Sequence, residues 1–299
     1  MEGRSFHSAW LVGEAPVRVA GAAFALFPWW SFTKTVLAVA AMRLVELGRL
    51  ELDALRPGQP YTLRQLLTHR AGVPNYGKLP AYHQAVARGE DAWSRERLLQ
   101  AVDSGRLDFA PGNAWSYSNV GYLFARDAVE EAAGLPLAEA LRELVLDPLG
   151  LDAVRLAAGR ADFAEVFWPH LRAYDPRWVY HGCLIGSPVD AVRLLHAILH
   201  GELVSEASLA QMLGRFTPLG GALPGRPVTE QAYGMGFMVG RMGAAGRAIG
   251  HNGAGPGSVN VVCHFPDLKT PVTVAVFTDG DDEGAAEYEA VAIALREQG

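Results

Sequence analysis

The sequence predicts an α/β (α+β) fold, in which an antiparallel sheet flanked by helices is built from both termini and carries a mostly helical insertion. Two observations predict this fold: strand-like patterns lie near both ends of the chain, and helix-like patterns fill its middle. At 299 residues we expect two domains, a sheet domain of residues 1–56 and 230–299 and a helical domain of residues 57–229.

The N-terminal elements are two short strands followed by a buried helix. Residues 7–12 and 16–21 have strand-like patterns, and a Gly-Glu-Ala turn separates them. Residues 33–47 are apolar on nearly every side, and Gly48 is placed to end a helix. We therefore expect this helix to lie inside the protein.

The middle of the chain predicts a series of helices with recognisable ends. Thr62 and Gln65 form a capping-box pair that opens a helix over residues 63–69. Ser94 can cap a second helix that ends at Gly105. Further helices are expected over residues 120–133, 136–146 and 187–200, and a polar loop over residues 108–119.

The C-terminal part changes from a helical to a strand-like period. Strands are expected over residues 232–241, 258–265 and 272–278, with Gly-rich turns between them. Residues 283–297 are helical again. Strands at both ends of the chain can pair in one sheet, which is the basis of the predicted architecture.

Charge and composition exclude several kinds of partner. The chain has 26 basic and 32 acidic residues, and its net charge of −6 argues against a nucleic-acid partner. Residues 1–10 lead into no apolar segment of a signal peptide, and no uncharged run would span a bilayer, so we expect a cytoplasmic protein without a membrane partner. Cys183 and Cys263 form no C-x-x-C pair and are expected to be small buried hydrophobes of a reduced compartment.

Ser31 and Lys34 are the first candidate chemical pair. They stand three residues apart at the start of the predicted buried helix, where positions i and i+3 share a face. A lysine that is partly desolvated has a lowered pKa and can help to activate a serine hydroxyl. The alternative is a helix-capping serine followed by a surface lysine, although the apolar neighbours leave no polar face for Lys34.

Two further patterns add a phenol, an amide and a glycine-rich segment. Tyr117 and Asn119 lie at the end of the polar loop, where a phenol near an ammonium can have a lowered pKa and accept a proton. Around His251 and Gly253, glycines let a main-chain N–H approach an oxyanion, and His251 could donate to a substrate carboxylate or to the reacting oxygen. Each pattern also occurs by chance: Tyr117 could be a half-buried tyrosine beside an Asn-capped helix.

Together and in this order, Ser31-x-x-Lys34, Tyr117-x-Asn119 and His251-x-Gly253 resemble the three motifs of the serine β-lactamase-like, penicillin-binding-protein superfamily. The closest resemblance is to its branch of class C β-lactamases, D,D-peptidases and esterases. The similarity extends over roughly residues 25–280 and includes flanking segments at residues 47–53, 62–74, 111–119, 147–151, 233–237 and 250–257. It implies a β-lactamase/transpeptidase-like fold with the active site between the two domains.

The resemblance also implies a reaction. Ser31 would be acylated by a small ester or amide, with Lys34 and Tyr117 sharing the proton that leaves the serine. Asn119 would hold Lys34 and the acyl amide, and the backbone N–H groups of Ser31 and Ala254 would form the oxyanion hole. Neither a cofactor nor a metal is implied. The alternatives are a non-catalytic relative that keeps the pocket to bind a ligand, and an acyltransferase.

Three departures from the family pattern qualify this resemblance. His251 stands where the lactamases have lysine, and in this position a histidine resembles esterases and peptidases more than efficient β-lactam hydrolases. We therefore do not expect lactamase activity to be the primary function. Only 30 residues precede Ser31, so one edge of the sheet is expected to be bare or covered by a partner chain, which leaves a homo-oligomer possible. Trp29 and Trp30 directly precede the nucleophile and are expected either to fill space or to narrow the pocket.

Other side chains have simpler interpretations. His196 and His200 have an i, i+4 spacing that can bind zinc, but the glutamate of a metalloprotease motif is missing between them, so we expect core or surface histidines. His69 is expected to be buried and fully hydrogen-bonded. Tyr233 and Phe237 are expected to be either pocket walls or strand core.

Overall fold

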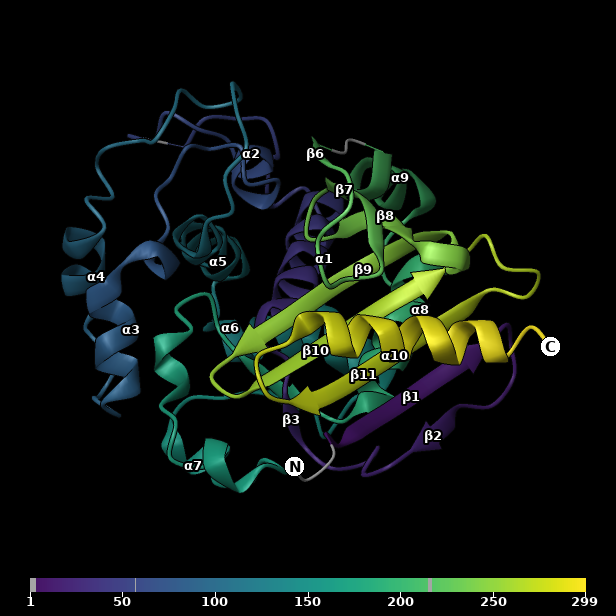
Figure 1. Cartoon of the computed structure of the whole chain (residues 1–299). Helices are drawn as coiled ribbons and strands as arrows, with labels where there is room; N and C mark the ends of the chain where they lie inside the picture. The colour runs from purple at the N-terminus through teal and green to yellow at the C-terminus, as the bar shows by residue number, and fades with distance from the viewer. Residues whose placement is uncertain (1–3, 57, 215–216) are drawn as a thin grey trace.

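An eight-stranded antiparallel sheet is the central feature of the computed structural model, which describes residues 4–56, 58–214 and 217–299 (Figure 1). Its strand order is β2-β1-β11-β10-β9-β8-β7-β6. The strands from the C-terminal part are β9 (Arg247–Gly255), β10 (Ser258–Phe265) and β11 (Val272–Asp279). The N-terminal strand β1 (Phe6–Val12) pairs with β11, so both ends of the chain build one sheet, as predicted.

The two edges of the sheet differ from the sequence prediction in detail. One edge is β2 (Arg18–Ala20), a fully exposed strand of three residues. The other edge is formed by β6 (Thr217–Gly220), β7 (Val228–Tyr233) and β8 (Met238–Met242). The prediction of one strand over residues 232–241 is wrong, because the chain turns between β7 and β8 at Gly236, whose φ of +77° suits glycine.

Strand β9 was expected to be a turn and is a strand of nine residues. Its glycines reduce its intrinsic preference for a strand, but they allow the backbone to lie against neighbouring groups. A Cβ on Gly253 would lie 2.6 Å from both the Trp29 carbonyl oxygen and the Asn260 side-chain nitrogen. Tertiary packing therefore decides the structure of this segment.

Helices cover both faces of the sheet (Figure 1). Helix α10 (Glu283–Arg296) packs on β10 and β11 from one side, and α8 (Pro188–Leu199) packs on β1, β10 and β11 from the other. Helix α1 (Thr33–Glu46) lies inside the protein and packs on α5 (Asn119–Ala133). Eleven of the 14 residues of α1 are buried, which confirms the prediction of a buried helix.

The remaining helices are short, and two of them begin at the predicted caps Thr62 and Ser94. Thr62 and Gln65 form the predicted capping box, and the Ser94 hydroxyl accepts a hydrogen bond from the Arg97 amide. These helices are α2 (Leu63–Leu67), α3 (Pro80–Ala87), α4 (Arg95–Ala101), α6 (Leu137–Leu141), α7 (Arg160–Phe163) and α9 (Glu206–Gly214). A small sheet of β3 (Phe27–Pro28), β5 (Leu184–Gly186) and β4 (Arg155–Leu156) connects the segment before α1 to the segment before α8.

The division into residues 1–56 plus 230–299 and residues 57–229 stays a prediction. Helix α8 belongs to the second range in sequence, yet it packs on the sheet, so contacts alone would group it with the first. Among the described residues, no helix is both long enough and apolar enough to cross a membrane.

Candidate active site

Ser31 lies in a short 3₁₀ turn, Trp30–Phe32, immediately before α1. Trp30 has a φ of +45°, which is costly for a side chain of this size, typically by about 1–3 kcal/mol. The surrounding packing holds it there: its indole N–H donates to the Ser258 hydroxyl at 2.9 Å, and the ring packs against Gly255. The tryptophan pair is therefore structural, while Trp30 also lines the cavity in front of Ser31.

Lys34 is fully buried, and its Nζ lies 3.0 Å from the Ser31 Oγ. The Nζ also lies 5.0 Å from the centre of the Tyr117 ring and 5.6 Å from that of Tyr122. Within the described part of the chain no carboxylate forms an ion pair with it. Burial lowers the pKa of Lys34 well below its usual value, which favours the neutral amine beside the serine.

Tyr117 contacts the serine from the other side. Its hydroxyl donates to the Ser31 Oγ at 3.0 Å. Burial raises the pKa of Tyr117 above its usual value, so the prediction of a lowered phenol pKa is wrong. The reason is that burial disfavours the charged phenolate and outweighs the hydrogen bond to Ser31, which favours it.

His181 is a site residue that no sequence pattern indicated. Its Nε2 lies 3.0 Å from the Lys34 Nζ, and the imidazole is buried. Burial, followed by the influence of Lys34, lowers the pKa of His181 well below its usual value, so the ring is neutral. It occupies the place expected for Asn119, which is not among the described hydrogen-bond partners of Lys34.

Asn119, Ala254 and Ser31 line one cavity of about 470 Å³. The rest of its wall is mostly aromatic and apolar, formed by Trp30, Tyr76, Gly77, Tyr82, His83, Val86, Ala87, Tyr174, Val179, His181, Gly255 and Pro256. These described lining residues include no lysine, arginine, aspartate or glutamate. A carbonyl beside Ser31 would thus lie in an uncharged pocket.

His251 is buried on β9 and has hydrogen-bond partners at both ring nitrogens. Its Nδ1 lies 2.6 Å from the Asn252 carbonyl oxygen, and the Tyr233 hydroxyl lies 2.9 Å from its Nε2. Burial lowers the pKa of His251 to about 3. The expectation that His251 donates to a substrate carboxylate does not fit this geometry, because the neutral ring has no free donor.

The other aromatic candidates now have definite places. Tyr233 lines a second cavity of about 120 Å³ together with Tyr117 and His251, whereas Phe237 is buried in the main core. His69 is buried as predicted, and its Nδ1 accepts from the Ser118 amide at 3.1 Å. Its Nε2 has no partner in the described structure, so the prediction of a fully hydrogen-bonded ring is wrong.

The two cysteines are free and buried, as predicted. Burial raises the pKa of the Cys183 thiol to about 12 and also raises that of Cys263. Neither thiol is therefore a nucleophile near neutral pH. Ser31 stays the candidate nucleophile.

Several known proteins are similar to this chain in sequence. A family model described as Beta-lactamase matches residues 6–298. Penicillin-binding protein 4* of Bacillus subtilis (strain 168) is 25% identical over 296 residues, which cover 88% of this chain and 62% of that protein. Esterase EstB of Burkholderia gladioli is 35% identical over 146 residues, which cover 42% of this chain and 37% of the esterase. The chain thus spans less than two thirds of the length of either relative.

A solved structure shares the fold over nearly the whole chain. It is D-amino acid amidase from Ochrobactrum anthropi SV3 in complex with L-phenylalanine. The TM-score is 0.80 at 19% identity, and the match covers 98% of this chain and 94% of that chain. The predicted fold class is therefore confirmed.

Proposed function

The chain belongs to the beta-lactamase family, and we propose that it is a serine hydrolase that cleaves a small ester or amide through an acyl-enzyme on Ser31. The observation that carries the proposal is the contact of one serine oxygen with two proton-handling groups. The Ser31 Oγ lies 3.0 Å from the Lys34 Nζ and 3.0 Å from the Tyr117 hydroxyl. An esterase among the relatives supports the same reaction class.

The lowered pKa of Lys34 and the raised pKa of Tyr117 support the following proton transfers. The neutral Lys34 amine accepts the Ser31 proton as the Oγ forms a bond to the substrate carbonyl carbon. Tyr117, which stays protonated, donates its hydroxyl proton to the leaving oxygen or nitrogen and is reprotonated from the Lys34 ammonium. Water then attacks the acyl carbon, one of its protons passes through Lys34 and Tyr117 to the Ser31 Oγ as the bond from Oγ to the acyl carbon breaks, and the acid leaves.

The remaining predicted residues would hold the acyl group. Ala254 lies on β9 at the cavity wall, where its N–H and that of Ser31 would form the oxyanion hole. Asn119 lines the same cavity and would donate to the acyl amide or carbonyl oxygen. Gly253 acts indirectly, because its lack of a side chain lets β9 approach Trp29.

The cavity favours a substrate with an uncharged, apolar or aromatic acyl part. Its described lining residues carry no fixed charge, and aromatic rings supply much of the wall. His251, with both nitrogens occupied, offers nothing to a carboxylate. This favours an esterase or amidase over an enzyme for peptides that end in a free carboxylate.

The binding-only and acyltransferase alternatives make different kinetic predictions. A non-catalytic relative would have no use for a fully buried lysine at 3.0 Å from a serine, because burying the amine destabilises the fold. An acyltransferase would share every step up to the acyl-enzyme and would then pass the acyl group to an added alcohol or amine.

Cytoplasmic location and a homo-oligomeric state stay predictions.

The direct test is covalent labelling and turnover. The protein should hydrolyse p-nitrophenyl butyrate, and a fluorophosphonate should add its mass at Ser31 and stop the reaction. Ser31→Ala should abolish both, with its melting temperature within about 2 °C of the wild type, while the loop variant Ser104→Ala should keep both. Folded protein without adduct or turnover on esters and amides would contradict the proposal.

A further inference from the structure

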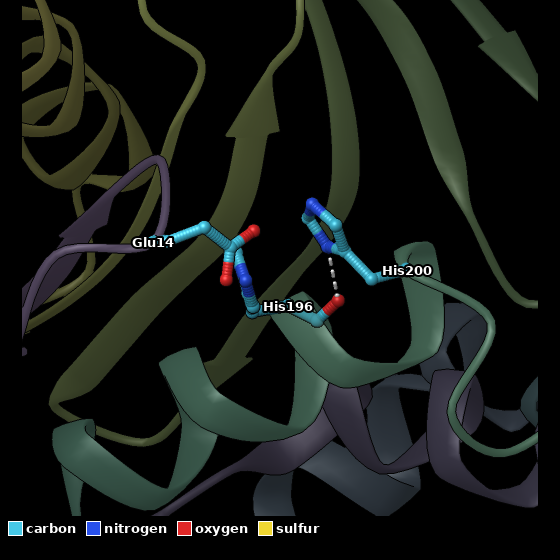
Figure 2. Close-up of side chains that lie close together, drawn as sticks. All are labelled: Glu14, His196 and His200. Carbon is cyan, nitrogen blue, oxygen red and sulfur yellow. Dashed lines mark hydrogen bonds between the residues drawn. The ribbon is translucent and has the colours of Figure 1, made fainter.

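A second group of chemically active side chains lies outside the Ser31 cavity. It consists of Glu14, from the turn between β1 and β2, of His196 from α8, and of His200, which caps the C-terminal end of α8. One ligand atom from each residue lies within 4.8 Å of the others, and Figure 2 shows the carboxylate and both rings gathered above α8. We propose that these three residues bind a divalent transition-metal ion, with Zn²⁺ as the best fit.

A hydrogen bond of the His200 ring decides which of its two nitrogens is free to bind a metal. Its Nδ1 lies 2.8 Å from the His196 carbonyl oxygen, a contact drawn as the dashed line in Figure 2. A carbonyl can only accept, so Nδ1 carries the proton and Nε2 keeps its lone pair. Metal-binding histidines commonly donate the second ring N–H to a carbonyl in this way.

His196 has a comparable partner on the sheet. Its Nδ1 lies 3.3 Å from the Thr273 hydroxyl, which also lies 2.9 Å from the Nδ1 of His264. One hydroxyl can accept from one ring and donate to the other. When His196 donates to Thr273 and Thr273 donates to His264, the His196 Nε2 is free to bind a metal.

The two imidazoles lie face to face, with ring centres 3.9 Å apart and planes inclined by 26°. This places both rings on the same side of α8, as the i, i+4 spacing requires. Glu14 supplies the third ligand and a negative charge from a segment far away in sequence. Glu14 would thus serve as the carboxylate ligand of a two-histidine, one-carboxylate site.

The donor set and its exposure define the ion. Two imidazoles and one carboxylate suit Zn²⁺ better than Mg²⁺ or Ca²⁺, which prefer all-oxygen sites. Glu14 and His200 are exposed and His196 is half-buried, so the ion can enter and water can complete its coordination. A bound ion would tie the β1–β2 turn at the sheet edge to the end of α8.

Calorimetric titration of the full chain with ZnCl₂ tests the site. We expect one zinc ion per chain, no comparable binding of MgCl₂, and a melting temperature raised by about 5 °C when zinc exceeds its Kd a hundredfold. Sub-stoichiometric zinc binding, or binding without thermal stabilisation, would overturn the proposal.

Variants localise the ion. His200→Ala and Glu14→Gln should each weaken zinc binding by about tenfold or more and reduce the thermal shift. His170→Ala, which removes another exposed histidine, should bind zinc as the wild type does. None of the three proposed ligands lines the Ser31 cavity, so ester hydrolysis is expected to be unchanged in His200→Ala. Equal zinc binding by the wild type and His200→Ala would place the ion elsewhere and refute the site.

Discussion

Two neighbouring residues of β9 face two buried polar clusters, of which one contains an ion pair and the other a lysine with neutral partners. His251 lies on the side of Ser31 and Lys34, where its ring bonds to Tyr233. Asn252 points the other way, because successive side chains of a strand alternate between faces. There its Nδ2 donates to Glu287 at 2.7 Å, beneath α10.

The cluster beneath α10 pairs its buried carboxylate with an arginine. The Arg226 Nε donates to Glu287 at 2.7 Å, and Arg226 also pairs with Glu283 at 3.2 Å. Glu287 is only 1% exposed, yet both of its oxygens have donors. Removing one partner from such a buried, hydrogen-bonded pair is strongly destabilising, so we assign Glu287 a role in the fold.

The cluster around Ser31 leaves its cationic residue without a counter-charge. Lys34 is as buried as Glu287, but its described hydrogen-bond partners are the neutral Ser31 and His181. The pKa of Lys34 falls because burial is not offset by a carboxylate. The two clusters therefore differ in charge pairing. The Glu287 carboxylate has a cationic partner and serves the fold, whereas the Lys34 amine has no charged partner among the described residues and is available for proton transfer.

The largest expected effect comes from removing the uncompensated amine. Lys34→Met keeps the length and apolar contacts of the side chain but removes the group that accepts the Ser31 proton. We expect kcat/KM for p-nitrophenyl butyrate to fall by about 10³–10⁴-fold without loss of folding, as checked by circular dichroism. The exposed variant Lys269→Met should retain full activity, and an active Lys34→Met enzyme would remove the amine from the mechanism.

The next effect concerns stability and not catalysis. Glu287→Ala leaves Arg226 and Asn252 without their principal acceptor, so we expect the free energy of unfolding to fall by about 3 kcal/mol. Urea denaturation measures this loss. The kcat of the folded variant should stay close to that of the wild type. A large loss of kcat with unchanged stability would contradict the assignment of this cluster to the fold.

The smallest expected effect sharpens the role of His181 in positioning Lys34. Activity needs the unprotonated amine, so kcat/KM rises as the pH rises through the lowered pKa of Lys34. His181→Phe keeps a buried ring but removes the Nε2 acceptor, which favours the ammonium more than the amine. We therefore expect the acidic limb of the profile to move to lower pH and kcat to fall by about tenfold.

His181→Gln, which restores an acceptor, should recover part of the wild-type profile. A merely structural role for His181 would lower the melting temperature of His181→Phe and leave the pH dependence of kcat/KM unchanged. The pH profile therefore separates positioning of Lys34 from packing.

Local sequence determined much of the site, because its key pair lies in one short helical segment. Ser31 in the 3₁₀ turn and Lys34 in the first turn of α1 are three residues apart, a spacing that brings their side chains together. The apolar neighbours of Lys34 also made its burial predictable. The helix starts at Thr62 and Ser94 were predictable too, because a cap acts within one helical turn. The family motifs indicated Tyr117, whose hydroxyl contacts the Ser31 Oγ in the structure.

Tertiary structure decided what depends on the direction of a side chain or on segments far apart in the chain. His181 reaches Lys34 from the turn before β5, and the Tyr233 hydroxyl bonds to the His251 ring across the sheet. Glu14 lies near His200 although the two are far apart in sequence. No local pattern encodes such contacts. The prediction of a lowered pKa for Tyr117 was wrong for the same reason. The sequence indicated a neighbouring amine, but the burial that raises the pKa of the phenol depends on the folded core.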